Sequence, residues 1–284
     1  MTAIRHVAVI GAGTMGAGIA QAFAQAGFRV HLHDPSAAAL ERAHDAIVHS
    51  LGKFVEKDAL SPGARDAALH RITTTNILDD GAAADFVVEA VVEDRAVKLA
   101  VFAALDRICR PDIVLASNTS SIAISALAGA TARPQRVVGM HFMNPVPLMP
   151  LVELIRGRET SDKAMLAARD LCAALGKTPI ESADSPGFIA NRILMPMINE
   201  AILALSEGVG TAEAIDSVMT IGMKHPMGPL RLADLIGLDV CLAILEVLHD
   251  GFNDTKYAPC TKLREMVAAG QMGRKSGRGF YVYG

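Results

Sequence analysis

The chain has 284 residues, of which 51% are hydrophobic, and a formal net charge of −3 at pH 7. This length suits two domains with sizeable cores, and the absence of a long Lys or Arg run argues against a nucleic-acid partner or a membrane surface. The four cysteines are scattered without CxxC spacing, so we expect reduced thiols, a cytoplasmic location and no metal site.

The N-terminal segment predicts a dinucleotide-binding turn. Residues 4–10 read as a short buried strand, too short to span a membrane, and a helix follows until Gly27. Between them lies the run Gly11, Ala12, Gly13, Thr14, Met15 and Gly16. In this pattern the first glycine permits a tight turn, the second lets the backbone approach a pyrophosphate, and the third lets the helix pack on the strand.

A second strand, residues 28–33, ends at Asp34, which follows Gly11 by 23 residues. An acidic residue at this distance accepts hydrogen bonds from the adenosine ribose hydroxyls. No arginine follows Asp34 to meet a 2′-phosphate, so NAD is favoured over NADP. The alternative interpretation is a glycine turn in some other α/β unit.

Further strand and helix patterns alternate along the chain, which predicts an α/β fold with a Rossmann-type doubly wound sheet. Polar side chains stand where strands should end, at the edge where such sheets bind ligands. Each Ser or Thr among them has an alternative role as a helix cap. The predicted strands are 85–90, 113–116, 137–142 and 151–155, with a helix at 98–107, and the polar positions are Glu93, 117–121, His141 and Asn144.

His141 and Glu153 form a candidate catalytic pair. The strand 137–142 delivers a histidine at its end, and Glu153 interrupts a second apolar run after three prolines that turn the chain back. Histidine exchanges protons near neutral pH, and a carboxylate at its far ring nitrogen orients the ring. A lone histidine in a strand is often only a hydrogen-bonded core residue, but a buried carboxylate needs a partner.

The pattern changes after about residue 184. Ser185-Pro186-Gly187 is a break, and the rest of the chain predicts helices without further strands. We therefore expect an α/β nucleotide-binding domain at 1–184 and a smaller all-α domain at 185–284 that binds substrate and forms a homodimer, the dimer by analogy alone. The predicted helices are 188–205, 211–219, 229–248 and 262–269.

These motifs together resemble the L-3-hydroxyacyl-CoA dehydrogenase family, most closely its short bacterial members that act on 3-hydroxybutyryl-CoA. The resemblance covers the whole chain. It rests on the glycine turn, Val88-Glu89-Ala90, the run 117–121 and the segment from His141 to Glu153. It continues in Ser185-Pro186-Gly187-Phe188 with Asn191-Arg192, in 226–229, and in 273–277 before Gly279-Phe280-Tyr281.

The resemblance implies an NAD-dependent oxidation of (S)-3-hydroxyacyl-CoA to 3-ketoacyl-CoA and its reverse, as in fatty-acid or butyrate metabolism. His141 would be the acid/base oriented by Glu153, and Ser120 and Asn191 would hold the reacting oxygen. Glu93, Lys98, Ser120, Asn144 and Lys275 correspond to positions that contact NAD. Lys98, Ser120 and Asn191 also correspond to positions on the substrate side.

Ser50 and Lys57 match family positions that meet CoA, and they lie seven residues apart, on one face of a predicted helix. Lys57 could equally be an ordinary surface lysine, and Lys53 shares the face and could replace it.

Other functions stay open at this point. A β-hydroxyacid or 6-phosphogluconate type of dehydrogenase would need a lysine one turn after Asn191, where Met195 stands. Relatives that act on 3-hydroxyadipyl-CoA, carnitine or gulonate do not face this objection. A non-enzymatic NAD-binding relative is disfavoured because His141, Glu153, Ser120 and Asn191 are all present.

Overall fold

A computed structural model describes residues 4–284 of the chain. The chain divides into two compact units, Met1–Ser185 and Pro186–Gly284. The first unit carries one large sheet with helices and the second is helical, which confirms the predicted fold class.

The sheet of the first unit has eight strands in the order β3-β2-β1-β4-β5-β6-β7-β8. All neighbouring strands are parallel except β6 and β7, which are antiparallel. The strand order reverses between β1 and β4, which is where a doubly wound sheet opens a crevice for a ligand. The strands are β1 (His6–Ile10), β2 (Arg29–His33), β3 (Ile72–Thr75), β4 (Phe86–Glu89), β5 (Val114–Ser117), β6 (Val137–Phe142), β7 (Leu151–Arg156) and β8 (Thr178–Ala183).

The two outer strands, β3 and β8, were not predicted from the sequence. Both lie at an edge of the sheet, and most of their residues are exposed or only partly buried. A strand with only one neighbour needs no continuous apolar run, so the signal that reveals the inner strands is missing there. The inner strands begin and end within two residues of their predicted bounds.

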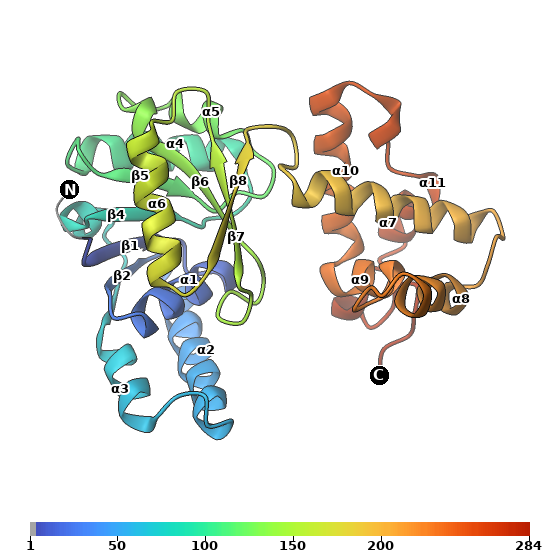
Figure 1. Cartoon of the computed structure of the whole chain (residues 1–284), viewed down its shortest axis with the longest axis horizontal. Coiled ribbons are helices and arrows are strands. Elements are labelled where there is room, and N and C mark those ends of the chain that lie inside the picture. The colour runs from blue at the N-terminus through green and yellow to red at the C-terminus, as the bar shows by residue number, and fades with distance from the viewer. Residues whose placement is uncertain (1–3) are drawn as a thin grey trace. The chain divides into compact units, whose positions relative to one another are not determined.

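Helices cover both faces of this sheet (Figure 1). One apolar core joins α1 and α6 to side chains such as Val9, Val88 and Met140. On the opposite face Ile124 of α5 lies against Gly139 of β6. A Cβ added at Gly139 would lie 3.0 Å from Cδ1 of Ile124. The bounds are α1 (Thr14–Gln25), α2 (Ala37–Glu56), α3 (Pro62–His70), α4 (Arg95–Ile108), α5 (Ile124–Ala128) and α6 (Asp162–Ala174), with short 3-10 turns η1 (Leu78–Ala83) and η2 (Pro134–Arg136).

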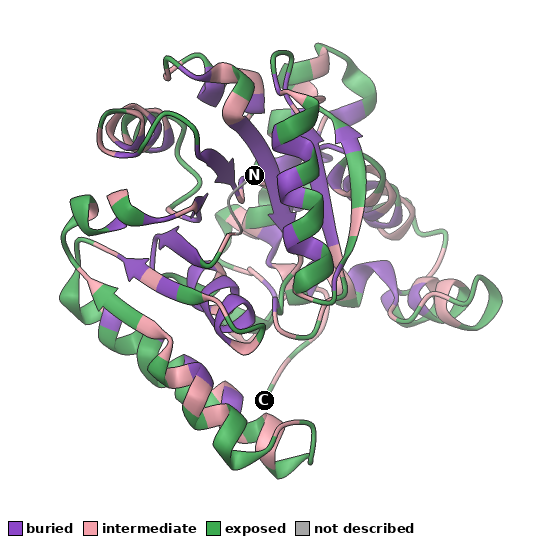
Figure 2. Cartoon of the chain, turned by 60° about the vertical axis from the view of Figure 1, so that its left-hand side comes forward, coloured by how far each residue is buried: buried purple, intermediate pink, exposed green. Residues whose placement is uncertain are grey.

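Burial explains why the inner strands read as apolar runs. β1, β4, β5 and β6 are buried along their whole length, as the purple strands of Figure 2 show. The polar side chains inside these strands therefore need partners within the protein. They are Glu89, Ser117 and His141, which stand at or near the carboxyl ends of their strands, and His6, at the amino end of β1.

The second unit is built from helices around its own apolar core. The predicted helix 229–248 is instead two helices, because Gly237 has φ +104° and breaks the hydrogen-bonded path between α9 and α10. The bounds are α7 (Ala190–Ser206), α8 (Ala212–Ser217), η3 (Val218–Gly222), α9 (Pro229–Ile236), α10 (Leu238–Phe252), η4 (Thr255–Tyr257), α11 (Thr261–Ala268) and η5 (Arg274–Ser276).

Among residues 4–284, no helix combines the length and the apolar character that crossing a membrane requires.

Candidate active site

The glycine turn after β1 has the geometry that a pyrophosphate requires. Gly11 has φ +106°, and a Cβ there would lie 2.5 Å from the carbonyl oxygen of Ala90. At Gly16 a Cβ would collide with the Gly11 carbonyl, so α1 can approach β1 only without a side chain at that position. A Cβ added at Gly13 would meet no protein atom within 4 Å, and Gly13 caps the start of α1 without a side-chain hydrogen bond. The first amides of α1 are thus available to an anion, as the fit to NAD demands.

Asp34 lies beside this turn, at the end of β2. Its Oδ2 accepts a hydrogen bond from the amide of Ala12 at 2.9 Å, and its Oδ1 accepts one from the amide of Ser36 at 2.9 Å. The carboxylate is only partly buried, so further lone pairs face outwards. This position, next to the glycine turn, suits an acceptor for ribose hydroxyls.

His141 and Glu153 face each other across the antiparallel pair β6–β7. They are direct partners in the register, so both side chains stand on one face of the sheet. Nδ1 of His141 lies 2.8 Å from Oε2 of Glu153, and the two residues are 8% and 2% exposed. The contact expected from the sequence is present, and it engages Nδ1 of the ring.

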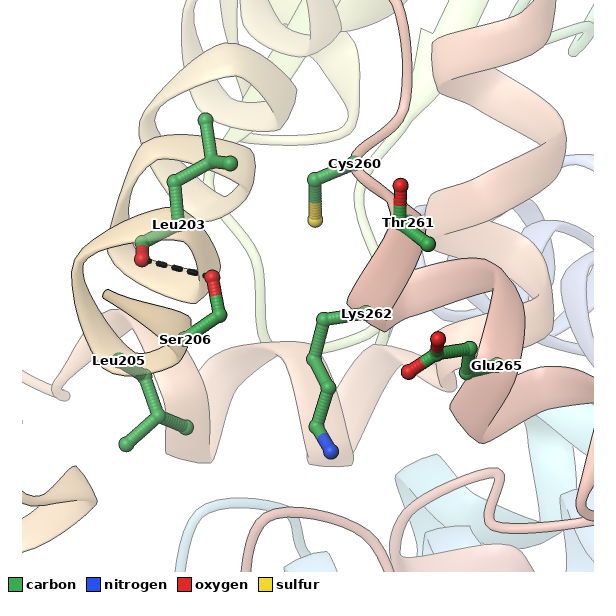
Figure 3. A pocket seen from close by; sticks show the side chains of 7 residues that line it. All are labelled: Leu203, Leu205, Ser206, Cys260, Thr261, Lys262 and Glu265. Atoms are coloured by element: carbon green, nitrogen blue, oxygen red, sulfur yellow. Dashed lines mark hydrogen bonds between the residues drawn. The ribbon is translucent and has the colours of Figure 1, made fainter. Parts of the chain in front are cut away.

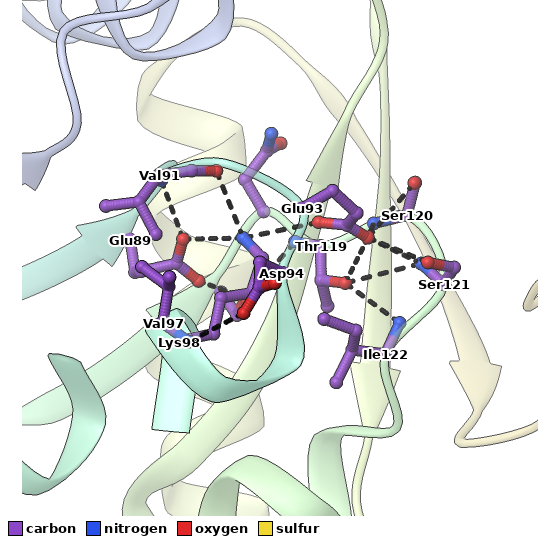
Figure 4. A network of polar contacts seen from close by, with 12 residues as sticks. Glu89, Val91, Glu93, Asp94, Val97, Lys98, Thr119, Ser120, Ser121 and Ile122 are labelled. Atoms are coloured by element: carbon purple, nitrogen blue, oxygen red, sulfur yellow. Dashed lines mark hydrogen bonds and ion pairs between the residues drawn. The ribbon is translucent and has the colours of Figure 1, made fainter. Parts of the chain in front are cut away.

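Glu93 gathers the loop after β5 around its carboxylate (Figure 4). Its Oε1 accepts hydrogen bonds from the hydroxyl of Thr119 at 2.6 Å and from the amides of Ser120 and Ser121 at 2.9 and 3.1 Å. The hydroxyls of Ser120 and Ser121 donate to the same oxygen at 3.2 and 2.9 Å. Burial alone would raise the pKa of this carboxyl, but the charge of Lys98 and these hydrogen bonds outweigh it and lower the pKa. Glu93 is therefore an anion at neutral pH.

Lys98 and Glu89 form a buried ion pair beneath this loop. Nζ of Lys98 lies 2.6 Å from Oε1 of Glu89, and their side chains are 1% and 0% exposed. The same nitrogen lies 3.3 Å from Oε2 of Glu93 and 3.4 Å from the carbonyl of Val91. Lys98 is thus held among protein acceptors, and its predicted contacts with NAD and the CoA arm stay predictions.

Glu89 is the residue of this site that the sequence analysis did not single out. Its Oε1 also accepts from the amide of Val91 at 2.7 Å, and its Oε2 accepts from the hydroxyl of Ser117 at 2.6 Å. The signal was available, because Glu89 interrupts the apolar sequence run 86–92 just as Glu153 interrupts the run of β7.

Two further contacts shape the ends of β5 and β6. Oδ1 of Asn118 accepts a hydrogen bond from the amide of Phe142 at 2.9 Å, which ties the loop after β5 to the residue after His141. The buried Lys177 donates to the carbonyls of Val146 and Met149, each at 2.7 Å, and so holds the loop between β6 and β7.

The other predicted site residues lie apart from this cluster or in the second unit. Asn144 is exposed on the loop between β6 and β7, and Ser50 is partly buried on α2. Lys57 caps the end of α2, one residue beyond the helix on which it was placed. In the second unit Asn191 is buried in the first turn of α7, and Lys275 pairs with Asp239.

The second unit contains a pocket of about 730 Å³ between the end of α7 and the start of α11 (Figure 3). Leu203, Ser206, Cys260 and Lys262 are among the residues that line it, and none of the predicted site residues is. Within residues 4–284 there is no group of three or more His, Cys, Asp or Glu side chains that could hold a metal ion.

Comparison with known proteins accounts for almost the whole chain. Residues 6–185 match the model of the 3-hydroxyacyl-CoA dehydrogenase NAD-binding domain, and residues 187–283 match that of the C-terminal domain. The probable 3-hydroxybutyryl-CoA dehydrogenase of Deinococcus radiodurans is 56% identical over 97% of this chain and 99% of its own. The 3-hydroxybutyryl-CoA dehydrogenase of Bradyrhizobium diazoefficiens is 52% identical over 99% of this chain and 96% of its own. The crystal structure of (S)-3-hydroxybutyryl-CoA dehydrogenase PaaH1 from Ralstonia eutropha has a TM-score of 0.96, 49% identity, and coverage of 99% and 100% of the two chains.

Proposed function

The chain belongs to the 3-hydroxyacyl-CoA dehydrogenase family, and we propose that it catalyses the NAD-dependent oxidation of (S)-3-hydroxybutyryl-CoA to acetoacetyl-CoA and the reverse reduction. The observation that carries this function is the buried pair of His141 and Glu153, held at 2.8 Å in a sheet that also bears the glycine turn. NAD, when bound, accepts the hydride that leaves C3 of the substrate.

His141 exchanges the proton of this reaction. In the oxidative direction its Nε2 takes the proton of the 3-hydroxyl group, and in the reductive direction it returns that proton to the ketone oxygen. Glu153 accepts the hydrogen bond of Nδ1, which fixes the tautomer and stabilises the imidazolium while it carries the extra proton. The pair therefore works only because the β6–β7 register places both side chains on one face.

Ser120 and Asn191 hold the reacting oxygen in this proposal, and Asp34 selects NAD. The Ser120 hydroxyl stands on the turn that Glu93 organises, close to the end of β5. Asp34 would repel a 2′-phosphate by its charge while it accepts from the ribose hydroxyls. Ser50 and Lys57 would meet the CoA moiety, whose phosphates favour a cation.

We further propose that the second unit forms a homodimer and that the protein works in the cytoplasm. Its surface carries exposed apolar side chains such as Val209, Ile221 and Met223, which are 75%, 71% and 60% exposed. All four cysteines are buried free thiols, as suits a reducing compartment. Light scattering of the purified protein tests the dimer.

A steady-state assay tests the function. We expect NADH oxidation with acetoacetyl-CoA, slower turnover with NADPH, and no turnover of free acetoacetate. Longer 3-ketoacyl-CoAs and a 3-oxoadipyl thioester define the acyl preference in the same assay. If no thioester supports NADH oxidation, the proposal is contradicted. Turnover of the free acid would instead indicate a hydroxy-acid dehydrogenase.

A further inference from the structure

We propose that the buried pair of Glu89 and Lys98 is a positioning device for the reaction, which acts through Glu93 on the turn that carries Ser120. The proposal rests on the proposed function in one respect, namely that Ser120 holds the reacting oxygen. Glu89 touches no ligand in this scheme and is a positioning residue, and Lys98, a predicted contact of NAD and of the CoA arm, also positions Glu93. Glu93 transmits their effect because it contacts Lys98 with one oxygen and the turn with the other.

Burying the pair of Glu89 and Lys98 costs free energy of hydration. Two charged groups that are 0% and 1% exposed lose their hydration, and an ion pair in such a place is often no more stable than apolar side chains of the same size. Stability alone therefore gives little reason for a glutamate in β4 and a lysine in α4. A geometric role explains why the charges are there.

Lys98 directs its contacts at β4 and at the segment that carries Glu93. An ammonium group has three N–H donors, and Lys98 has three acceptors around it: Oε1 of Glu89, the Val91 carbonyl and Oε2 of Glu93. Glu89 belongs to β4, and the other two acceptors belong to the segment between β4 and α4. Two of these contacts are hydrogen bonds and the third is an ion-pair contact, through which the charge of the lysine serves the carboxylate of Glu93.

The contacts of Glu93 and Glu89 converge on the turn that carries Ser120. With Oε2 held by Lys98, Oε1 of Glu93 accepts from the amides of Ser120 and Ser121 and from three hydroxyl groups. Glu89 reaches the same turn by a second route, because it holds the Ser117 hydroxyl, which accepts from the amide of Thr119 at 3.1 Å. Both routes start at Glu89: the first passes through Lys98 and Glu93 to Ser120 and Ser121 (Figure 4), and the second ends on the amide of Thr119.

The experiment uses Glu89→Gln, Lys98→Met and the double variant in the full-length protein. Each single change leaves a buried charge without its partner, so we expect a loss of stability. The double variant removes both charges and should recover stability, but Glu93 stays untethered. We expect its kcat with acetoacetyl-CoA, measured at saturating NADH, to remain about 10- to 100-fold low, because small displacements of a positioning group cost this much.

Asp106→Asn is the matched control, because it breaks a partly buried ion pair at the other end of the same helix. Asp106 lies in the last turn of α4 and contacts Arg133 at 2.6 Å. This variant should lose stability while its kcat per folded molecule stays that of the wild type. The contrast separates a structural ion pair from a positioning one.

Hydrogen–deuterium exchange of the peptide that contains residues 117–123 gives a readout that needs no turnover. The amides of Ser120 and Ser121 should exchange faster in the double variant than in the wild type. In Asp106→Asn their exchange rates should equal those of the wild type. Wild-type kcat in the double variant, or unaltered exchange in this peptide, would overturn the positioning role. If the wild type itself does not turn over acetoacetyl-CoA, the proposed function fails, and the exchange experiment still decides whether the pair orders the turn.

Discussion

The carboxyl and amino edges of the sheet in the first unit both contain buried charges, and they use them differently. At the amino edge Arg133 pairs with Asp106 and donates to the backbone carbonyls of Asp106 and Cys109 at 2.5 and 3.0 Å. Asp85 accepts from the amides of Arg5 and His6 at 3.0 and 3.1 Å. Charges there fasten one stretch of backbone to another.

At the carboxyl edge the charges hold side chains as well as backbone amides. Glu153 orients the ring of His141, and Glu93 orients the hydroxyls of Ser120 and Ser121. The difference follows from the fold, because loops at the carboxyl ends of parallel strands converge on the crevice where a ligand binds. Damage to a charge should therefore reduce turnover at the carboxyl edge and stability at the amino edge.

The largest expected effect is that of His141→Gln at the carboxyl edge. Loss of the acid/base should lower kcat by about 10³- to 10⁴-fold, while NADH binding, measured by its fluorescence, stays intact. Glu153→Gln keeps an acceptor near Nδ1 but removes the charge, so its kcat should lie between those of His141→Gln and the wild type. Substantial turnover by His141→Gln would contradict the mechanism.

Asp34→Ala should weaken NADH binding about tenfold, which corresponds to one lost hydrogen bond to a charged group. NADPH should lose less affinity, because the charge that opposes its 2′-phosphate is gone. Titration with both nucleotides measures the change, and Asp45→Ala, an exposed carboxylate on α2, is the control. Equal NADH affinity in Asp34→Ala and the wild type would refute the ribose assignment.

Asp106→Asn should cost about 1–3 kcal/mol of stability, because it leaves the buried Arg133 with a weaker partner. Urea unfolding measures the loss, and kcat per folded molecule should not change. A drop in kcat without a drop in stability would erase the distinction between the two edges.

The smallest expected effect concerns His6 at the amino edge. Burial and the neighbouring His31 lower the pKa of His6, so the unfolded chain binds a proton that the folded chain resists. This contribution is therefore complete above about pH 6.5 and is lost as the pH falls towards the lowered pKa of the folded state. His6→Gln should make the acid-side fall in stability shallower, because glutamine binds no proton in either state.

Urea unfolding at several pH values measures this change, and His49→Gln, at an exposed position on α2, is the control. An unaltered slope in His6→Gln would show that other groups cause the acid sensitivity.

Local pattern predicted the parts of the fold in which neighbours in sequence share one environment. The inner strands are buried on both faces and therefore read as apolar runs, and the glycine turn depends on backbone sterics within a few residues. The edge strands β3 and β8 have no such signal. Gly237 was not recognised as a break, because the apolar spacing continues across it from α9 into α10.

The sequence by itself determined which chemistry the chain carries: a histidine and a glutamate in apolar strands, a glycine turn, and an acidic residue after the second strand. Only the tertiary structure decided which groups meet. The register of β6 on β7 pairs His141 with Glu153, and the approach of β4, α4 and β5 brings Glu89, Lys98 and the Ser120 turn together. These pairings join residues far apart in the chain, and strand register and packing place them, which no local pattern of residues encodes.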